Sequence, residues 1–272
     1  MLKINEKFKE LALKKEGALI IGTVPGYPDL KTSFQIIKKI VSSGADILEL
    51  SSSFSDPIAD GSTLTDAHQK VLDLGITKKQ LFDFYKKITT SFDIPIFIIE
   101  YANIVYKIGP DKYFGQLKAC GIDTVIIPDI PLEELGPFYR LAAKNQVNLA
   151  LIIAPTSPDK RIKMIAEKSK AFVYGVLITG VTGVRKSIGA GTVDFIKRAR
   201  KLVALPLIVG FGISQPRHIA ALSKHKVNGF VICSKIIDII NKNLSNKGKM
   251  LHELGKYVAN MKSTTHGKKR GQ

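Results

Sequence analysis

The sequence has few cysteines and no long apolar run, and both absences limit what it can be. No stretch approaches the roughly 18 uninterrupted apolar residues of a membrane-spanning helix, and the charged segment 1–17 lacks the apolar region of a signal peptide. Cys120 and Cys233 are far apart and neither has a CxxC neighbour, so a zinc site or redox pair is not expected. We therefore expect a cytoplasmic protein with two reduced, buried cysteines and no membrane segment.

Acidic residues are also scarce, with 23 Asp and Glu against 41 Lys and Arg and a formal net charge of +18. Such a charge raises nucleic-acid binding as a possible function. However, the basic residues are spread along helical stretches such as 195–201, and only 266–272 is a compact basic run. RGG repeats, RNP-like strand motifs and zinc fingers are lacking as well. A solvated basic surface that attracts an anionic substrate is the favoured interpretation, and nucleic-acid binding the weaker alternative.

What the sequence does contain is a regular alternation of two patterns within 272 residues, 45% of them hydrophobic. Short, nearly continuous apolar runs predict parallel strands covered on both faces: 18–24, 46–52, 94–101, 123–130, 148–155, 172–179, 206–212 and 229–235. Segments with apolar residues three and four apart predict helices: 3–15, 31–44, 65–74, 78–91, 111–119, 132–144, 159–168, 191–202, 216–224 and 249–261.

Eight β-α repeats in order leave two architectures, a closed barrel or a doubly wound sheet. A doubly wound dinucleotide-binding domain should carry GxGxxG after its first strand, but here 24–29 reads VPGYPD. The sequence therefore predicts a single (β/α)8 TIM barrel over 1–262, with the N-terminal helix closing its bottom and 263–272 as a basic flexible tail.

Two carboxylates mark the second strand and the loop that follows it. Glu49 interrupts an apolar run, where an unpaired carboxylate would be costly, so it is either structurally paired or functional. Asp60 follows eleven residues later, in a loop stiffened by Pro57, while Asp56 is interpreted as a turn residue. In such barrels the active site lies at the carboxyl ends of the strands. The pair is thus a candidate for proton transfer by one carboxyl group while the other stays ionised.

Three further strand ends carry glycine or serine turns suited to an anion. They are GVTG (180–183), GFGIS (210–214), where Ser214 is expected to cap the next helix, and CSKI (233–236), where Ser234 lies at a helix N-terminus. On successive strand ends they predict a phosphate site. No catalytic or metal-ligand role is expected for the five histidines, because none lies at a strand end. Asp129 and Asn103 are interpreted as loop-anchoring or partner-contact residues.

Taken together, these motifs resemble the α-subunit of tryptophan synthase over residues 17–240. The most specific is SDPIADG with its upstream glutamate. The segments that carry the resemblance are ADILELSSSFSDPIADG (45–61), IIPDIPLEE (126–134), APTSPDKRI (154–162), TGVTG (179–183) and VGFGIS (209–214).

The resemblance implies retro-aldol cleavage of indole-3-glycerol phosphate to indole and glyceraldehyde 3-phosphate in tryptophan biosynthesis. It implies that Glu49 shuttles the proton at indole C3 and that Asp60 stabilises the charge developing on the indole N–H. It further implies no cofactor or metal in this chain, and a pyridoxal-phosphate β-subunit as partner in an α2β2 complex. The remaining residues that it implies are Gly183, Gly212 and Ser234 for phosphate, and Leu64, Ile126, Ile153 and Tyr174 for the indole pocket.

The sequence departs from the family pattern at several points near these residues. Ser51–Ser53 replace GVP or GIP, 24–28 replaces TAGDP, Gly175 replaces a second tyrosine, Cys233 replaces a glycine beside the phosphate, and Glu100 replaces an apolar residue. The retained carboxylates favour retained chemistry with altered rate or affinity. Two alternatives stay open: a drifted subunit that mainly binds and activates its β-subunit, and another phosphosugar barrel, an isomerase or epimerase.

Overall fold

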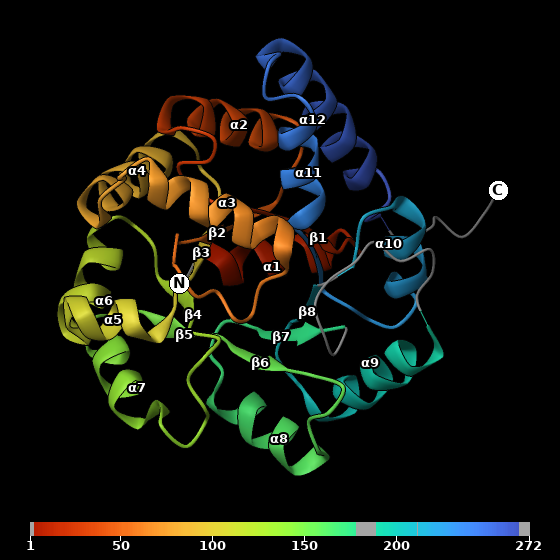
Figure 1. Cartoon of the computed structure of the whole chain (residues 1–272). Helices are drawn as coiled ribbons and strands as arrows, with labels where there is room; N and C mark the ends of the chain where they lie inside the picture. The colour runs from red at the N-terminus through yellow and green to blue at the C-terminus, as the bar shows by residue number, and fades with distance from the viewer. Residues whose placement is uncertain (1–2, 178–188, 211, 267–272) are drawn as a thin grey trace.

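The computed structural model describes residues 3–177, 189–210 and 212–266. Its strands form one all-parallel sheet in the order β5-β4-β3-β2-β1-β9-β8-β7-β6. The end strands β5 and β6 are separated by Ala150 alone, so the sheet closes on itself and the predicted eight-stranded barrel is confirmed (Figure 1). The strands are β1 (Ala18–Thr23), β2 (Ile47–Ser51), β3 (Ile96–Ile99), β4 (Thr124–Ile126), β5 (Asn148–Leu149), β6 (Leu151–Ile153), β7 (Val173–Val176), β8 (Leu207–Gly210) and β9 (Gly229–Ile232).

Helices ring the barrel and shield the outer face of its strands from water (Figure 1). The prediction of helices missed α5, which has only seven residues; α11 begins at Ser234, where the sequence placed a helix N-terminus without giving its range. The helices are α1 (Lys3–Leu13), α2 (Leu30–Ser42), α3 (Ser62–Asp73), α4 (Lys78–Ser91), α5 (Ala102–Ile108), α6 (Pro110–Ala119), α7 (Leu135–Lys144), α8 (Asp159–Lys168), α9 (Ala190–Leu202), α10 (Pro216–Ser223), α11 (Ser234–Lys242) and α12 (Lys247–Lys262).

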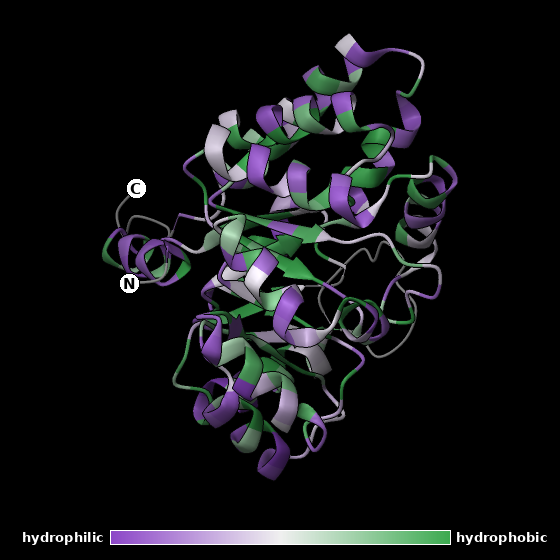
Figure 2. Ribbon diagram, turned by 90° about the vertical axis from the view of Figure 1, so that its left-hand side faces the viewer, coloured by the Kyte–Doolittle hydropathy of each residue, from purple (hydrophilic) through white to green (hydrophobic). Residues whose placement is uncertain are grey.

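Helix α1 lies across one end of the barrel (Figure 2). Its apolar face joins the inward-facing strand residues in one buried cluster, distinct from the larger cluster between strands and outer helices. Phe8 of α1 meets Phe172 edge to face at 6.1 Å between ring centroids, and Phe97 meets Phe172 at 5.0 Å. The predicted closure of the barrel bottom by the N-terminal helix is therefore confirmed.

The packed part of the chain extends past the boundary expected at residue 262. The Gly17 amide donates to the Thr265 carbonyl at 3.0 Å, and His266 Nδ1 lies 2.8 Å from Glu16 Oε1. Thr265 itself is buried. Backbone pairing with the segment before β1 thus holds residues 263–266 on the barrel.

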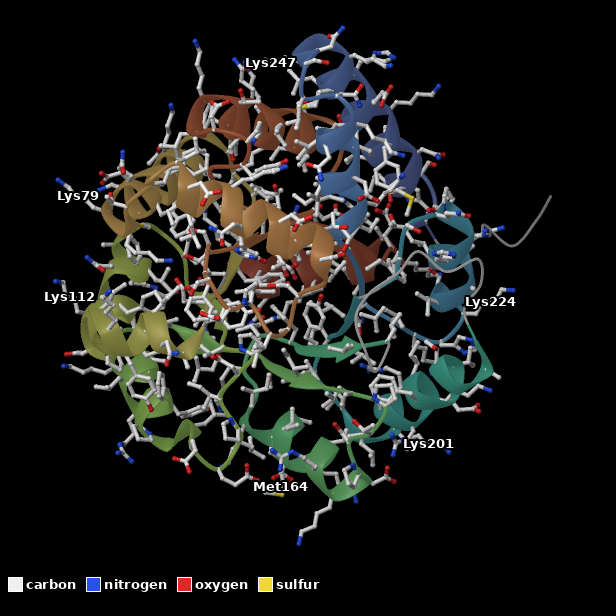
Figure 3. The ribbon with its side chains drawn as sticks, viewed as in Figure 1. Lys79, Lys112, Met164, Lys201, Lys224 and Lys247 are labelled. Atoms are coloured by element: carbon white, nitrogen blue, oxygen red, sulfur yellow. The ribbon has the colours of Figure 1, made fainter. Side chains whose placement is uncertain are left out.

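The outer surface carries the excess positive charge. Figure 3 shows Lys79, Lys112, Lys201 and Lys224 at the rim of the helix ring, with side chains directed away from the barrel. This arrangement agrees with the expected solvated basic surface. Within the described residues, no helix is both long enough and apolar enough to cross a bilayer.

Candidate active site

A cavity of about 140 Å³ opens at the carboxyl ends of the strands, opposite α1. It brings together most of the residues that the sequence singled out, from the second, seventh and ninth strands and from the segments after the second, eighth and ninth strands. Gly183 lies outside the described residues. The lining residues are Glu49, Asp60, Gly61, Thr63, Leu64, Ile99, Tyr174, Gly212, Ile213, Ser214, Val231, Cys233, Ser234, Lys235 and Asp238.

Glu49 faces the interior of the barrel because side chains alternate along β2, and its neighbour two residues earlier, Ile47, belongs to the interior cluster. The Glu49 residue is only 2% exposed. Burial, reinforced by the negative charge of Asp60, raises the pKa of Glu49 to about 8, although a hydrogen bond with the Tyr174 hydroxyl opposes this rise. Glu49 is therefore mostly protonated at neutral pH and able to donate a proton.

Asp60 is hydrogen-bonded by one aromatic side chain and approached by a second, and the sequence pointed to neither. The Tyr101 hydroxyl donates to Asp60 Oδ2 at 2.8 Å and accepts from the Ala59 N–H at 3.2 Å. The Nε2 atom of His68 lies 3.4 Å from the same Oδ2. These contacts fix the orientation of the carboxylate before any ligand arrives.

His68 lies beside the site, although the sequence analysis gave the histidines no catalytic or metal-ligand role. It is fully buried on α3, one turn after Leu64, which lines the cavity. Residues four apart share a helix face, so the Leu64–His68 spacing is the signal that could have placed this histidine. The sequence analysis considered only residues at the carboxyl ends of strands, so it did not place His68 beside Asp60.

The opposite wall of the cavity carries the groups suited to an anion. Gly212 has φ +86°, a conformation that favours glycine, and Ser234 is the first residue of α11, where helix amide groups lack carbonyl partners. Lys235 adds a cation that the sequence analysis did not assign.

Ser214 does not cap α10, because this helix begins after Gln215. The Ser214 Oγ is instead buried on the cavity wall, with no hydrogen-bond partner among the described residues.

Cys233 points into the barrel rather than toward the anion-binding wall. A β-carbon built on Gly22 would lie 2.8 Å from Cys233 Sγ and 2.7 Å from Glu49 Oε1. The thiol and the carboxyl group therefore meet over the bare backbone of Gly22. The Cys233 side chain thus lies at the Glu49 end of the cavity, and altered affinity for phosphate at this position stays a prediction. Burial, with the nearby charge of Glu49, raises the pKa of the thiol and keeps it neutral.

The two predicted indole-pocket residues on β4 and β6 do not line the cavity. Ile126 belongs to the interior cluster, on the same side as the site. Ile153 packs in the outer cluster between strands and helices, whereas Ile152 faces the interior. Neither residue lines the cavity, so the assignment of Ile153 to the indole pocket stays a prediction. Ile99 and Val231 are the apolar wall residues that the sequence analysis missed.

Asp129 and Asn103 are the two residues that the sequence assigned to loop anchoring or partner contact. Asp129 accepts a hydrogen bond from the Ala102 N–H at 2.9 Å, at the start of α5, which agrees with a loop-anchoring role. Asn103 is exposed on the same helix. Among the residues that the structure describes, no three His, Cys, Asp or Glu side chains are grouped as a metal site.

Comparisons with known proteins identify the family of the chain. The family model described as tryptophan synthase alpha chain matches residues 8–266. The tryptophan synthase alpha chain of Caldanaerobacter subterraneus is 38% identical over 264 residues, covering 96% of this chain and 99% of the relative. That of Methanocaldococcus jannaschii is 35% identical over 254 residues, covering 93% and 90%.

Solved structures share the fold, and one of them is named as tryptophan synthase. A structure from Aquifex aeolicus has a TM-score of 0.89 at 32% identity, covering 98% of this chain and all of that one. A chain of the tryptophan synthase α2β2 complex from Pyrococcus furiosus has a TM-score of 0.84 at 30% identity, covering 90% and 98%. With the family model matching nearly its whole length, the chain belongs to the tryptophan synthase alpha chain family.

Proposed function

We propose that the chain cleaves indole-3-glycerol phosphate by a retro-aldol reaction that yields indole and glyceraldehyde 3-phosphate. One observation carries the proposal: Glu49 and Asp60 face a single cavity whose far wall, at Gly212 and Ser234, is suited to phosphate. The raised pKa of Glu49 supports its role as the acid, because a carboxyl group that keeps its proton at neutral pH can donate it.

The reaction needs one net proton transfer, from a hydroxyl group to a ring carbon. Glu49 donates its proton to indole C3, which leaves the ring as an iminium cation. Asp60 accepts a hydrogen bond from the ring N–H and stabilises that cation. The Glu49 carboxylate then removes the proton of the hydroxyl group next to C3, and the carbon–carbon bond breaks as the carbonyl forms. The bonding electrons return to the ring, which leaves as neutral indole, and Glu49 is protonated again.

Each step uses groups that this chain supplies, so we propose that the α reaction requires no cofactor. The α2β2 assembly of the Pyrococcus furiosus relative supports a β-subunit as the partner, where the resemblance places pyridoxal phosphate. Biosynthesis of an amino acid supports the cytoplasm as its place of action.

An indole-release assay on purified protein, with and without a β-subunit, tests the proposal. We expect indole and glyceraldehyde 3-phosphate in equal amounts, and loss of both in Asp60→Asn. Stimulation of a β-subunit without any release of indole would favour the drifted-subunit alternative. Conversion of other phosphosugars with no cleavage of this substrate would favour an isomerase.

A further inference from the structure

Two departures from the family pattern, Ser51–Ser53 and Glu100, turn out to be parts of one buried cluster. The side chain that joins them is Lys78, the first residue of α4. Its Nζ donates to Ser52 Oγ and to the Ser53 carbonyl, both at 2.9 Å, and lies 4.0 Å from Glu100 Oε1. Changes that look unrelated in the sequence therefore meet at the end of β2.

The cluster contains two charged side chains, Lys78 and Glu100, at positions where the barrel fold does not require a charge. Glu100 is 2% exposed, and the exposed fraction of the Lys78 side chain is 33%. Tyr85 and Tyr113 are both buried near Glu100, and the negative charge of Glu100 contributes to raising the pKa of each hydroxyl group. Because a buried ion pair gains little stability over well-packed apolar residues, stability alone does not explain it.

Both ends of this cluster continue to the groups that hold the catalytic carboxylates. On one side, Lys78 fixes the backbone at Ser53, four residues after Glu49 and at the start of the loop that carries Asp60. On the other side, the Tyr101 N–H donates to Glu100 Oε1 at 3.3 Å, and the Tyr101 hydroxyl donates to Asp60 at 2.8 Å. A continuous path of contacts thus runs from Lys78 to Asp60.

We propose that Lys78 and Glu100 are positioning residues that set the orientation of Asp60 through Tyr101 and through the loop after β2. The inference rests on the proposed function only in taking Asp60 as the group that binds the indole N–H. Neither residue lines the cavity, so their effect on the reaction is indirect.

The test replaces the pair by apolar side chains of similar length, as Lys78→Met/Glu100→Met. Removing both charges avoids an unpaired buried charge, so we expect the melting temperature to stay near that of the wild type. We expect kcat to fall about 10- to 100-fold, because small misplacements of a catalytic group have effects of that order. KM should change less than about threefold, since ground-state binding is retained.

A double-mutant cycle with Tyr101→Phe shows whether the effect passes through Tyr101. We expect Tyr101→Phe to lower kcat about tenfold in the wild type and less than about twofold in the double-methionine variant. The matched control is Lys262→Met, which breaks the Lys262–Asp46 pair beside the other end of β2; it should lower stability and leave kcat unchanged. Additive effects in the cycle, or wild-type kcat in Lys78→Met/Glu100→Met, would overturn the inference.

A second readout separates this inference from the proposed function. Indole-3-propanol phosphate lacks the hydroxyl groups that cleavage requires, so its dissociation constant can be measured even for an inactive protein. If the wild type binds this compound but releases no indole from the substrate, the proposed function fails, and crystal structures of the wild type and of Lys78→Met/Glu100→Met still test the inference: we expect Asp60 to be displaced in the variant, and an unmoved Asp60 would overturn it. If the wild type binds neither compound, both proposals are overturned.

Discussion

Glu49→Gln separates the acid–base role of this residue from its structural one, because the two side chains have nearly the same shape. In the folded protein Glu49 keeps its proton up to a pKa of about 8, whereas in the unfolded chain it ionises near 4.5. Between these values the folded state binds more protons than the unfolded state, so the free energy of unfolding decreases as pH rises. This contribution is fully present below pH 4.5 and is lost by about pH 8.

At about 1.4 kcal/mol per pH unit, the wild type loses up to roughly 5 kcal/mol of stability across this window. Glutamine has no proton to lose at this position, so Glu49→Gln is free of this contribution. We expect the variant to be within about 1 kcal/mol of the wild type at pH 5 and several kcal/mol more stable at pH 9. Activity should fall about 10²- to 10⁴-fold, as for loss of a proton-transfer group.

Urea unfolding at a series of pH values measures the difference directly, because the titration of all other groups is shared by the two proteins and largely cancels. A stability difference that stays flat from pH 5 to pH 9 would refute the reasoning that burial holds the proton on Glu49. Turnover equal to that of the wild type would refute its catalytic assignment.

The remaining predictions concern the two walls of the cavity. Gly22→Ala should destabilise the fold by about 1–3 kcal/mol and displace Glu49, which lowers kcat. Adding Cys233→Gly should restore part of the stability and part of kcat, measured by thermal melts and by indole release. If neither recovers, the contact between Cys233 and Gly22 is contradicted. Lys235→Met should weaken substrate binding about tenfold by loss of a charge-assisted contact, measured as KM at low salt. The exposed Lys224→Met is its control, and an equal effect there would indicate only general attraction by surface charge.

The barrel and its catalytic end could be predicted from the sequence because each depends on a local pattern. A parallel strand buried on both faces has a continuous apolar sequence, so Glu49 was conspicuous within 46–52. The direction of a strand side chain is less secure, since an error of one residue changes the face. Ile153, which the resemblance assigns to the indole pocket, packs in the outer cluster, while Ile152 contacts the interior cluster.

Contacts made by long side chains across neighbouring elements could not be predicted in the same way. Lys78 begins a helix and looks like one more surface cation, and nothing in its local sequence shows that its amine reaches Ser52 and Glu100. Similarly, Cys233 and Gly22 are brought together by the pairing of β1 with β9. Such contacts depend on the register of strands distant in sequence, which no local pattern reports.

The edge-to-face stack of Phe8, Phe172 and Phe97 seals the barrel at the end away from the cavity. A small aromatic product formed beside Glu49 therefore has to depart through the mouth by which its phosphorylated precursor arrived. A second protein can collect that product only if it docks over this mouth. A protein that docked beside α1 would leave the product to diffuse into bulk water.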